Sequence, residues 1–147
     1  MSAGLMHTPS PPAPTTKEPE LAQPTSPVHS NTLRSSFRYA FAGLAYCFRT
    51  QRNFRIHIGI TMAAALLGLV LGLTWAEWAV LATMVVLVLS AEMVNTMIES
   101  LVDLVTVEYH PLAKIAKDVA AGIVLLTAIG AVIVGLIIFG PKLFLRG

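Results

Sequence analysis

The chain of 147 residues is unusually apolar: 55% of its residues are hydrophobic, only 12% are charged, and its net charge is +2. A soluble domain carries about 25% charged residues, and one this apolar would expose large patches and aggregate. The composition therefore favours an integral membrane protein and argues against a secreted or cytosolic globule. The single cysteine, Cys47, excludes an intramolecular disulfide and a multi-cysteine metal site.

The first 32 residues differ in composition from the rest of the chain. They hold seven of the nine prolines, among serine, threonine and a few charges. Such a segment cannot bury enough apolar surface to offset its chain entropy, so residues 1–32 are predicted to be a disordered cytoplasmic tail. The segment also lacks the basic start and apolar run of a signal peptide.

Between residues 33 and 52, apolar and aromatic residues recur at roughly helical spacing and are interrupted by arginines. The apolar set is Leu33, Phe37, Tyr39, Ala40, Phe41, Leu44 and Phe48. A basic helix with one aromatic face is typical of a helix that lies on an anionic membrane surface. The alternative is an amphipathic helix packed on a soluble core, but the sequence shows no such core.

Three apolar segments follow and predict three membrane-spanning helices. Their expected bounds are residues 54–73, 76–107 and 114–140. The uncharged part of the first segment, residues 58–73, has sixteen residues and is short for the ~20 that a span needs, so Phe54 and Ile56 are included to extend it. The third has twenty-one consecutive uncharged residues, and Gly140 and Pro141 are expected to end it.

The first span has polar residues at its start and small residues near its end. Arg55 and His57 lie at the start, where their side chains can reach the membrane surface. Gly68 and Gly72 form a GxxxG pair, which suits close helix–helix approach but is common in apolar helices.

The basic residues are distributed unevenly around these spans. Five arginines and no acidic residue occur in the stretch that leads into the first span, and the link before the third span holds Lys114 and Lys117. The short link at residues 74–77 has no Lys or Arg, while Lys142 and Arg146 lie near the C-terminus. The positive-inside rule then predicts a multi-pass protein of the cell membrane with a cytoplasmic N-terminus and an external C-terminus.

The second span carries a row of polar residues near its C-terminal end. They are Glu92, Asn95, Glu99, Asp103 and Thr106. At about 100° per residue, the first four fall within a stripe about 80° wide. Carboxylates in a membrane helix are costly and mark a functional site by default. Such a stripe can hold a divalent cation, since hard ions prefer carboxylate and amide oxygens, or it can supply a general base.

A simpler explanation is that this end of the helix projects into the cytosol with a polar side. A solvated face usually includes basic partners, yet no Lys or Arg occurs from residue 93 to residue 109, so a functional site is favoured. After the link, Lys117 can contact a phosphate and Asp118 can orient a metal. The acidic stripe together with this lysine predicts metal-assisted phosphoryl transfer. No GxxxxGK[ST] or GxGxxG loop occurs, so any nucleotide site must be built from helix side chains.

Three strings of residues resemble the small prokaryotic diacylglycerol kinase family, whose members phosphorylate diacylglycerol or undecaprenol. They are AEMVNTMIESLVD at 91–103, AKIAKDVAAG at 113–122 and NFRIH at 53–57. The resemblance covers roughly residues 33–140. It implies an all-α membrane lipid kinase, with a surface helix and three spans, that transfers the γ-phosphate of ATP with Mg²⁺ to the primary hydroxyl of a lipid alcohol. It also implies a homotrimer with active sites at the cytoplasmic boundary between protomers, and no nucleic-acid partner is expected.

The resemblance also implies roles for individual residues. Glu92 would be the catalytic base near the lipid hydroxyl, with Asn53 also at the lipid, and Glu99 would be a metal ligand. The residues implied at the ATP site are Tyr39, Asn95, Glu99, Asp103, Glu108, His110, Lys117 and Asp118. Where the family usually has a second metal-ligating Glu, this chain has Gln51. A glutamine offers a carbonyl oxygen without charge, so a lower metal affinity is expected.

Two other functional classes stay open. A small transporter or channel subunit would use Glu92 and Glu99 as a proton or cation relay near mid-membrane. However, the fourteen uncharged residues before Glu92 rise about 21 Å, which places it towards the cytoplasmic side of a ~30 Å core. A catalytically weak or inactive member would act as a membrane scaffold, and Gln51 is the best argument for it. The NFRIH string looks closer to the undecaprenol kinases, but the acceptor lipid stays open.

Overall fold

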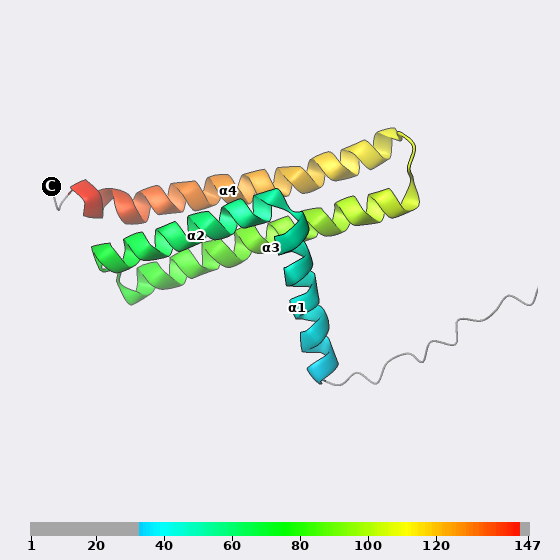
Figure 1. Cartoon of the computed structure of the whole chain (residues 1–147). Helices are drawn as coiled ribbons and strands as arrows, with labels where there is room; N and C mark the ends of the chain where they lie inside the picture. Colours follow the sequence, from blue (N-terminus) through cyan, green and yellow to red (C-terminus); the bar gives the residue numbers. More distant parts are fainter. Residues whose placement is uncertain (1–32, 145–147) are drawn as a thin grey trace, which may run out of the picture. The chain divides into compact units, whose positions relative to one another are not determined.

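The computed structural model describes residues 33–144, which form four helices joined by short links. The helices are α1 (Leu33–Thr50), α2 (Arg52–Leu71), α3 (Trp75–Val105) and α4 (Pro111–Phe144). Figure 1 shows α2, α3 and α4 running side by side, while α1 leaves the start of α2 at a steep angle. The predicted tail at residues 1–32 and the terminal Arg146 lie outside the described residues.

The three helices after α1 are each long and apolar enough to cross a membrane, as the sequence predicts. They have 20, 31 and 34 residues, which correspond to lengths of about 30, 46 and 51 Å at 1.5 Å per residue. Only α2 matches the ~30 Å hydrocarbon core of a bilayer. The extra length of α3 and α4 lies beyond the start of α2, at the end where α3 connects to α4 (Figure 1).

The apolar residues of α1 gather on one side of the helix, within about 80° at about 100° per residue. They are Leu33, Phe37, Phe41, Leu44 and Phe48, and all five are exposed. Gln51 separates α1 from α2, so the surface helix ends at Thr50 and not at residue 52. An apolar stripe without cover from the rest of the described chain is consistent with a helix on a membrane surface.

The turn between α2 and α3 gives the two glycines of the expected GxxxG pair different tasks. Gly72 has a φ of +66° and ends α2 in the left-handed region that favours glycine. A Cβ on Gly72 would meet nothing within 4 Å, whereas one on Gly68 would lie 2.9 Å from Cη2 of Trp78 on α3. The packing prediction is therefore wrong for Gly72, and Gly68 alone provides the close approach.

A capping box at the start of α3 is linked to the end of α4. The Thr74 hydroxyl accepts from the Glu77 N–H at 3.3 Å, and the Glu77 carboxylate accepts from the Thr74 N–H at 2.6 Å. The same carboxylate lies 3.1 Å from Nζ of Lys142. The prediction that Gly140 and Pro141 end the third span is wrong, because α4 continues for three residues beyond the proline. The proline removes one helical hydrogen bond, but the Lys142–Glu77 ion pair holds the last turn against α3.

The link between α3 and α4 is shorter than the sequence predicts. Helix α3 ends at Val105 because Thr106 becomes its C-cap, in an extended conformation. Helix α4 begins at Pro111, since proline is favoured at the first position of a helix. Nδ1 of His110 accepts from the backbone N–H of Leu112 at 3.2 Å and so caps α4 from the preceding position.

Candidate active site

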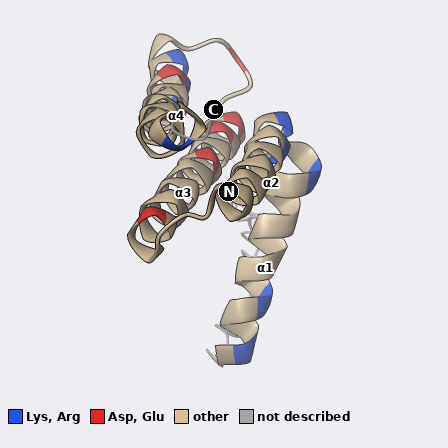
Figure 2. Ribbon diagram, turned by 90° about the vertical axis from the view of Figure 1, so that its left-hand side faces the viewer, with Lys and Arg blue, Asp and Glu red and all other residues tan. Residues whose placement is uncertain are grey.

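Helix α3 contributes the largest group of buried side chains in the described region. They are Val88, Ala91, Glu92, Asn95 and Thr96. Glu92 is 2% exposed and Asn95 is 9% exposed, while Glu99 is half-buried and Asp103 is exposed. Figure 2 shows the acidic positions distributed along α3, which has no Lys or Arg. The predicted stripe therefore runs from the interior of the helix bundle to its surface.

Two oxygens of the buried part of the stripe have no hydrogen-bond partner in the described structure: Oε1 of Glu92 and Oδ1 of Asn95. The Asn95 amide nitrogen is engaged, because it donates to Oε1 of Glu99 at 3.0 Å. Buried polar atoms are nearly always paired, so two unpaired acceptors on one helix face need an explanation. A ligand that brings a hydrogen-bond donor to this face would satisfy them.

The imidazole of His57 on α2 faces the buried acid. Its Nε2 lies 3.2 Å from Oε1 of Glu92, and the two side chains are 20% and 3% exposed. The two atoms approach closely without the alignment of a hydrogen bond. The sequence singled out His57 only as a polar residue at the edge of its span. Helical periodicity gives the face of a residue on its own helix, but not which residue of a neighbouring helix it meets.

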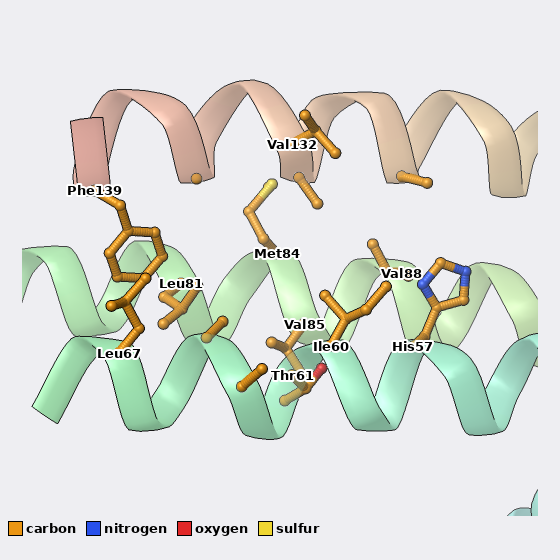
Figure 3. A pocket seen from close by; sticks show the side chains of 15 residues that line it. His57, Ile60, Thr61, Leu67, Leu81, Met84, Val85, Val88, Val132 and Phe139 are labelled. Atoms are coloured by element: carbon orange, nitrogen blue, oxygen red, sulfur yellow. The ribbon is translucent and has the colours of Figure 1, made fainter. Parts of the chain in front are cut away.

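An apolar cavity of about 410 Å³ lies among α2, α3 and α4, with His57 among its lining residues. Figure 3 shows the imidazole at one end of the row of lining side chains and Leu67 and Phe139 at the other. Val88, one helical turn before Glu92, also lines it. Glu92 therefore adjoins the polar end of a cavity whose other walls are almost entirely hydrocarbon.

A second cavity of about 410 Å³ lies at the α3–α4 link and is polar. Its charged and hydrogen-bonding lining residues are Asp103, Thr106, Glu108, Tyr109, His110, Lys114, Lys117 and Asp118. The structure thus brings together five residues that the sequence assigned to one nucleotide site: Asp103, Glu108, His110, Lys117 and Asp118. Tyr109 and Lys114 also line it, and their closeness in sequence to His110 and Lys117 was the available signal.

The charges of this polar cavity are paired across and along the helices. Nζ of Lys117 on α4 lies 2.6 Å from Oδ1 of Asp103 on α3. Lys114 and Asp118, four residues apart on α4, form a second ion pair. All four side chains are more than a third exposed, so these contacts are solvent-screened and readily exchanged. A phosphate could replace Asp103 as the partner of Lys117 with little rearrangement.

The structure does not place the other predicted residues in either cavity. Tyr39, on α1, is 51% exposed, and the guanidinium of Arg38 lies 5.1 Å from its ring centre. Asn53 is exposed in the first turn of α2. Gln51 is the N-cap residue of α2, half-buried, and its side chain makes no capping hydrogen bond. Gln51 and Asn53 lie at the α1–α2 corner and Tyr39 lies in the second turn of α1, so none of the three belongs to the polar cavity.

Comparisons with known proteins show the family to which the chain belongs. The family model described as prokaryotic diacylglycerol kinase matches residues 38–139. The chain is 54% identical to a diacylglycerol kinase of Synechocystis sp. over 109 residues, which are 74% of this chain and 62% of that protein. It is 42% identical to the undecaprenol kinase of Bacillus subtilis over 118 residues, which are 78% of this chain and 96% of that protein. It is also 36% identical to a diacylglycerol kinase of Pseudomonas aeruginosa over 93 residues, or 62% and 76% of the two chains. The chain thus spans less than two thirds of the Synechocystis relative and nearly all of the Bacillus one, and it belongs to the prokaryotic diacylglycerol kinase family.

Proposed function

We propose that this protein is an ATP-dependent lipid kinase that phosphorylates the primary hydroxyl of a membrane lipid alcohol. Its family and its three long apolar helices support this activity. Both diacylglycerol kinase and undecaprenol kinase occur among the names of its relatives. The acceptor is therefore diacylglycerol or undecaprenol, and both are apolar alcohols suited to the same kind of cavity.

The observation that carries the proposal is the position of Glu92. Its carboxylate is almost fully buried beside the polar end of the apolar cavity. A lipid chain in that cavity would bring its hydroxyl to this carboxylate. Glu92 then acts as the general base: it accepts the hydroxyl proton while the oxygen bonds to the γ-phosphorus of ATP, and ADP leaves with the electrons of the broken P–O bond.

The polar cavity at the α3–α4 link is the proposed nucleotide site. Lys117 exchanges Asp103 for a phosphate oxygen, and Nε2 of His110 remains free to donate because Nδ1 already accepts a backbone hydrogen bond. Asp103, Glu108 and Asp118 complete the proposed lining. Along α3, this cavity and Glu92 are separated by eleven residues, or about 16 Å.

The donor set along the stripe fits Mg²⁺ bound together with a nucleotide. In residues 33–144 no three His, Cys, Asp or Glu side chains cluster closely enough to hold a metal by themselves. Mg²⁺ commonly takes one or two carboxylates together with substrate phosphates, and Glu99 offers one half-buried carboxylate beside the unpaired Asn95 oxygen. When bound, the metal would neutralise the charge of the phosphates. Gln51 would offer only a neutral oxygen.

We further propose a cytoplasmic N-terminus and active site, an external C-terminus, and a homotrimer. The support for the orientation is the arginine-rich stretch before α2 and the lysines at the start of α4. The support for assembly is the separation of about 16 Å between Glu92 and Asp103 along α3, which a neighbouring chain could bridge by supplying one of the two sites.

The alternatives find less support. A carboxylate relay needs acids at mid-membrane, but Glu92 meets His57, the sixth residue of α2, about 8 Å from the start of a helix about 30 Å long. A scaffold without catalysis has no use for a buried carboxylate beside an apolar cavity. Gln51 is the remaining observation in favour of a weak or inactive enzyme.

The test is phosphate transfer from labelled ATP with Mg²⁺ to diacylglycerol or undecaprenol in mixed micelles. Purified protein should label one of these lipids, and Glu92→Gln should lower the rate by about 10²–10⁴-fold, the usual contribution of a general base. Glu77→Gln is the matched control on the same helix, because glutamine preserves a capping box. Folded protein that labels neither lipid would refute the kinase proposal, and a fully active Glu92→Gln variant would remove Glu92 as base.

A further inference from the structure

Among the described residues, the close polar contact of the Glu92 carboxylate is with a side chain of another helix. On α3, the Thr96 hydroxyl donates to the backbone carbonyl of Glu92 at 2.9 Å, and not to its side chain. The Asn95 amide donates to Glu99. Only the imidazole of His57, from α2, approaches the carboxylate, at 3.2 Å. The orientation of the buried acid is therefore set from a different helix.

His57 also belongs to the wall of the apolar cavity. Its ring lies at one end of the lining residues in Figure 3, and its Nε2 is the atom that approaches Glu92. The imidazole is thus placed between the hydrocarbon cavity and the carboxylate. A side chain in that position can hold one carboxylate oxygen and leave the other to an incoming hydroxyl.

We propose that His57 is the positioning residue for Glu92, an inference that rests on the lipid kinase function proposed above. Its Nε2–H donates to Oε1 of Glu92, and Oε2 is thereby directed to the hydroxyl of a lipid whose chain fills the apolar cavity. The present approach of 3.2 Å becomes an aligned hydrogen bond when the acceptor is bound, as catalytic hydrogen bonds often tighten only in the substrate complex. The proton moves from the hydroxyl to Oε2, and His57 keeps its own hydrogens throughout.

Kinetics of three variants test this role. His57→Phe keeps a ring in the cavity wall but removes the donor, and it should lower kcat by about 10²-fold, the cost of a misplaced catalytic group, with an unchanged KM for ATP. His57→Gln keeps an N–H donor and should recover most of that loss. Met62→Phe is the control: it adds the same ring to an exposed position of α2 that does not line the cavity.

The imidazole resonances give a readout that does not depend on activity. In ¹⁵N-histidine-labelled protein, the His57 signal, identified by its loss in His57→Phe or His57→Gln, should shift on Glu92→Gln and stay in place on Met62→Phe. A His57 resonance whose chemical shift does not change on Glu92→Gln would contradict the proposed contact. Wild-type protein that phosphorylates no lipid would refute the kinase function, whereas an active wild type with equally active His57→Phe and Met62→Phe variants would refute the positioning role alone.

Discussion

At Gln51 the chain presents a neutral amide where the family resemblance implies a carboxylate that binds metal. Gln51 is the N-cap residue of α2, but its side chain makes no capping hydrogen bond and so does not stabilise the start of the helix in that way. Replacement by glutamate should therefore cost little stability, and a negative charge at a helix N-terminus is favourable. A substitution at this position can therefore measure how strongly one negative charge affects metal binding.

We expect Gln51→Glu to lower the Mg²⁺ concentration that gives half-maximal lipid phosphorylation by on the order of tenfold, because a second carboxylate near the ion adds Coulomb attraction. Thr50→Glu adds the same charge one residue earlier, at the exposed end of α1, and controls for a general electrostatic effect. Titration of the rate with Mg²⁺ measures both variants. Equal responses in the two would show that residue 51 does not face the metal.

At the scale of elements, the α2–α3 hairpin has a close approach of the two helices near its turn. Gly68 lies against the ring of Trp78, and the turn that follows uses the left-handed conformation of Gly72. This hairpin fixes the lengthwise register of α2 against α3. The same register brings His57 opposite Glu92, so a packing contact at one end of the hairpin positions chemistry at the other.

We expect Gly68→Ala to destabilise the protein by about 1–3 kcal/mol, the usual cost of overpacking, because the new Cβ would lie 2.9 Å from the Trp78 ring. Gly59→Ala on the same helix meets nothing within 4 Å. It should be neutral or stabilising by up to ~1 kcal/mol, since alanine is the better helix former. Thermal unfolding in detergent compares them, and equal Tm values would contradict the packing role of Gly68.

At the scale of the whole molecule, the two halves of the proposed reaction are far apart on one chain. The proposed acceptor side is centred on Glu92 between α2 and α3, and the proposed nucleotide side is the polar cavity at the α3–α4 link. Many side chains of α4 and α1 remain exposed and apolar, as expected for helices covered by lipid or by other copies. Assembly between chains would place a nucleotide side next to another chain's Glu92.

Mixing two inactive variants tests a shared site. If one chain supplies Glu92 and its neighbour supplies Lys117, oligomers that contain both Glu92→Gln and Lys117→Gln chains should have some intact sites. For random mixing of equal amounts in a ring, roughly one site in four keeps both residues. Lipid phosphorylation by the co-expressed variants, compared with each variant alone, measures this recovery. Activity no greater than that of the separate variants would mean that each chain carries its own complete site.

The sequence predicts the polar stripe of α3 well because helical periodicity acts within one element. Glu92 and Asn95 share a buried face as expected, and three helices suited to span a membrane are present. The pairs between helices, His57 with Glu92 and Lys117 with Asp103, depend on register and rotation, which composition does not encode. The continuation of α4 past Pro141 is likewise accompanied by an ion pair between helices, Lys142 with Glu77.

The unequal lengths of the helices have a consequence for the choice of membrane. Because α2 is about 30 Å long and α3 and α4 extend well beyond its start (Figure 1), a bilayer matched to α2 would place Glu92, opposite His57, near one headgroup region. A thicker bilayer would draw the carboxylate under hydrocarbon, and a thinner one would leave it in water. Hydrophobic mismatch of this kind costs only fractions of a kcal/mol per Å. With Glu92 as the proposed base, bilayer thickness would therefore affect the rate of the reaction, and the lipid around the protein would be a regulator as well as the source of its substrate.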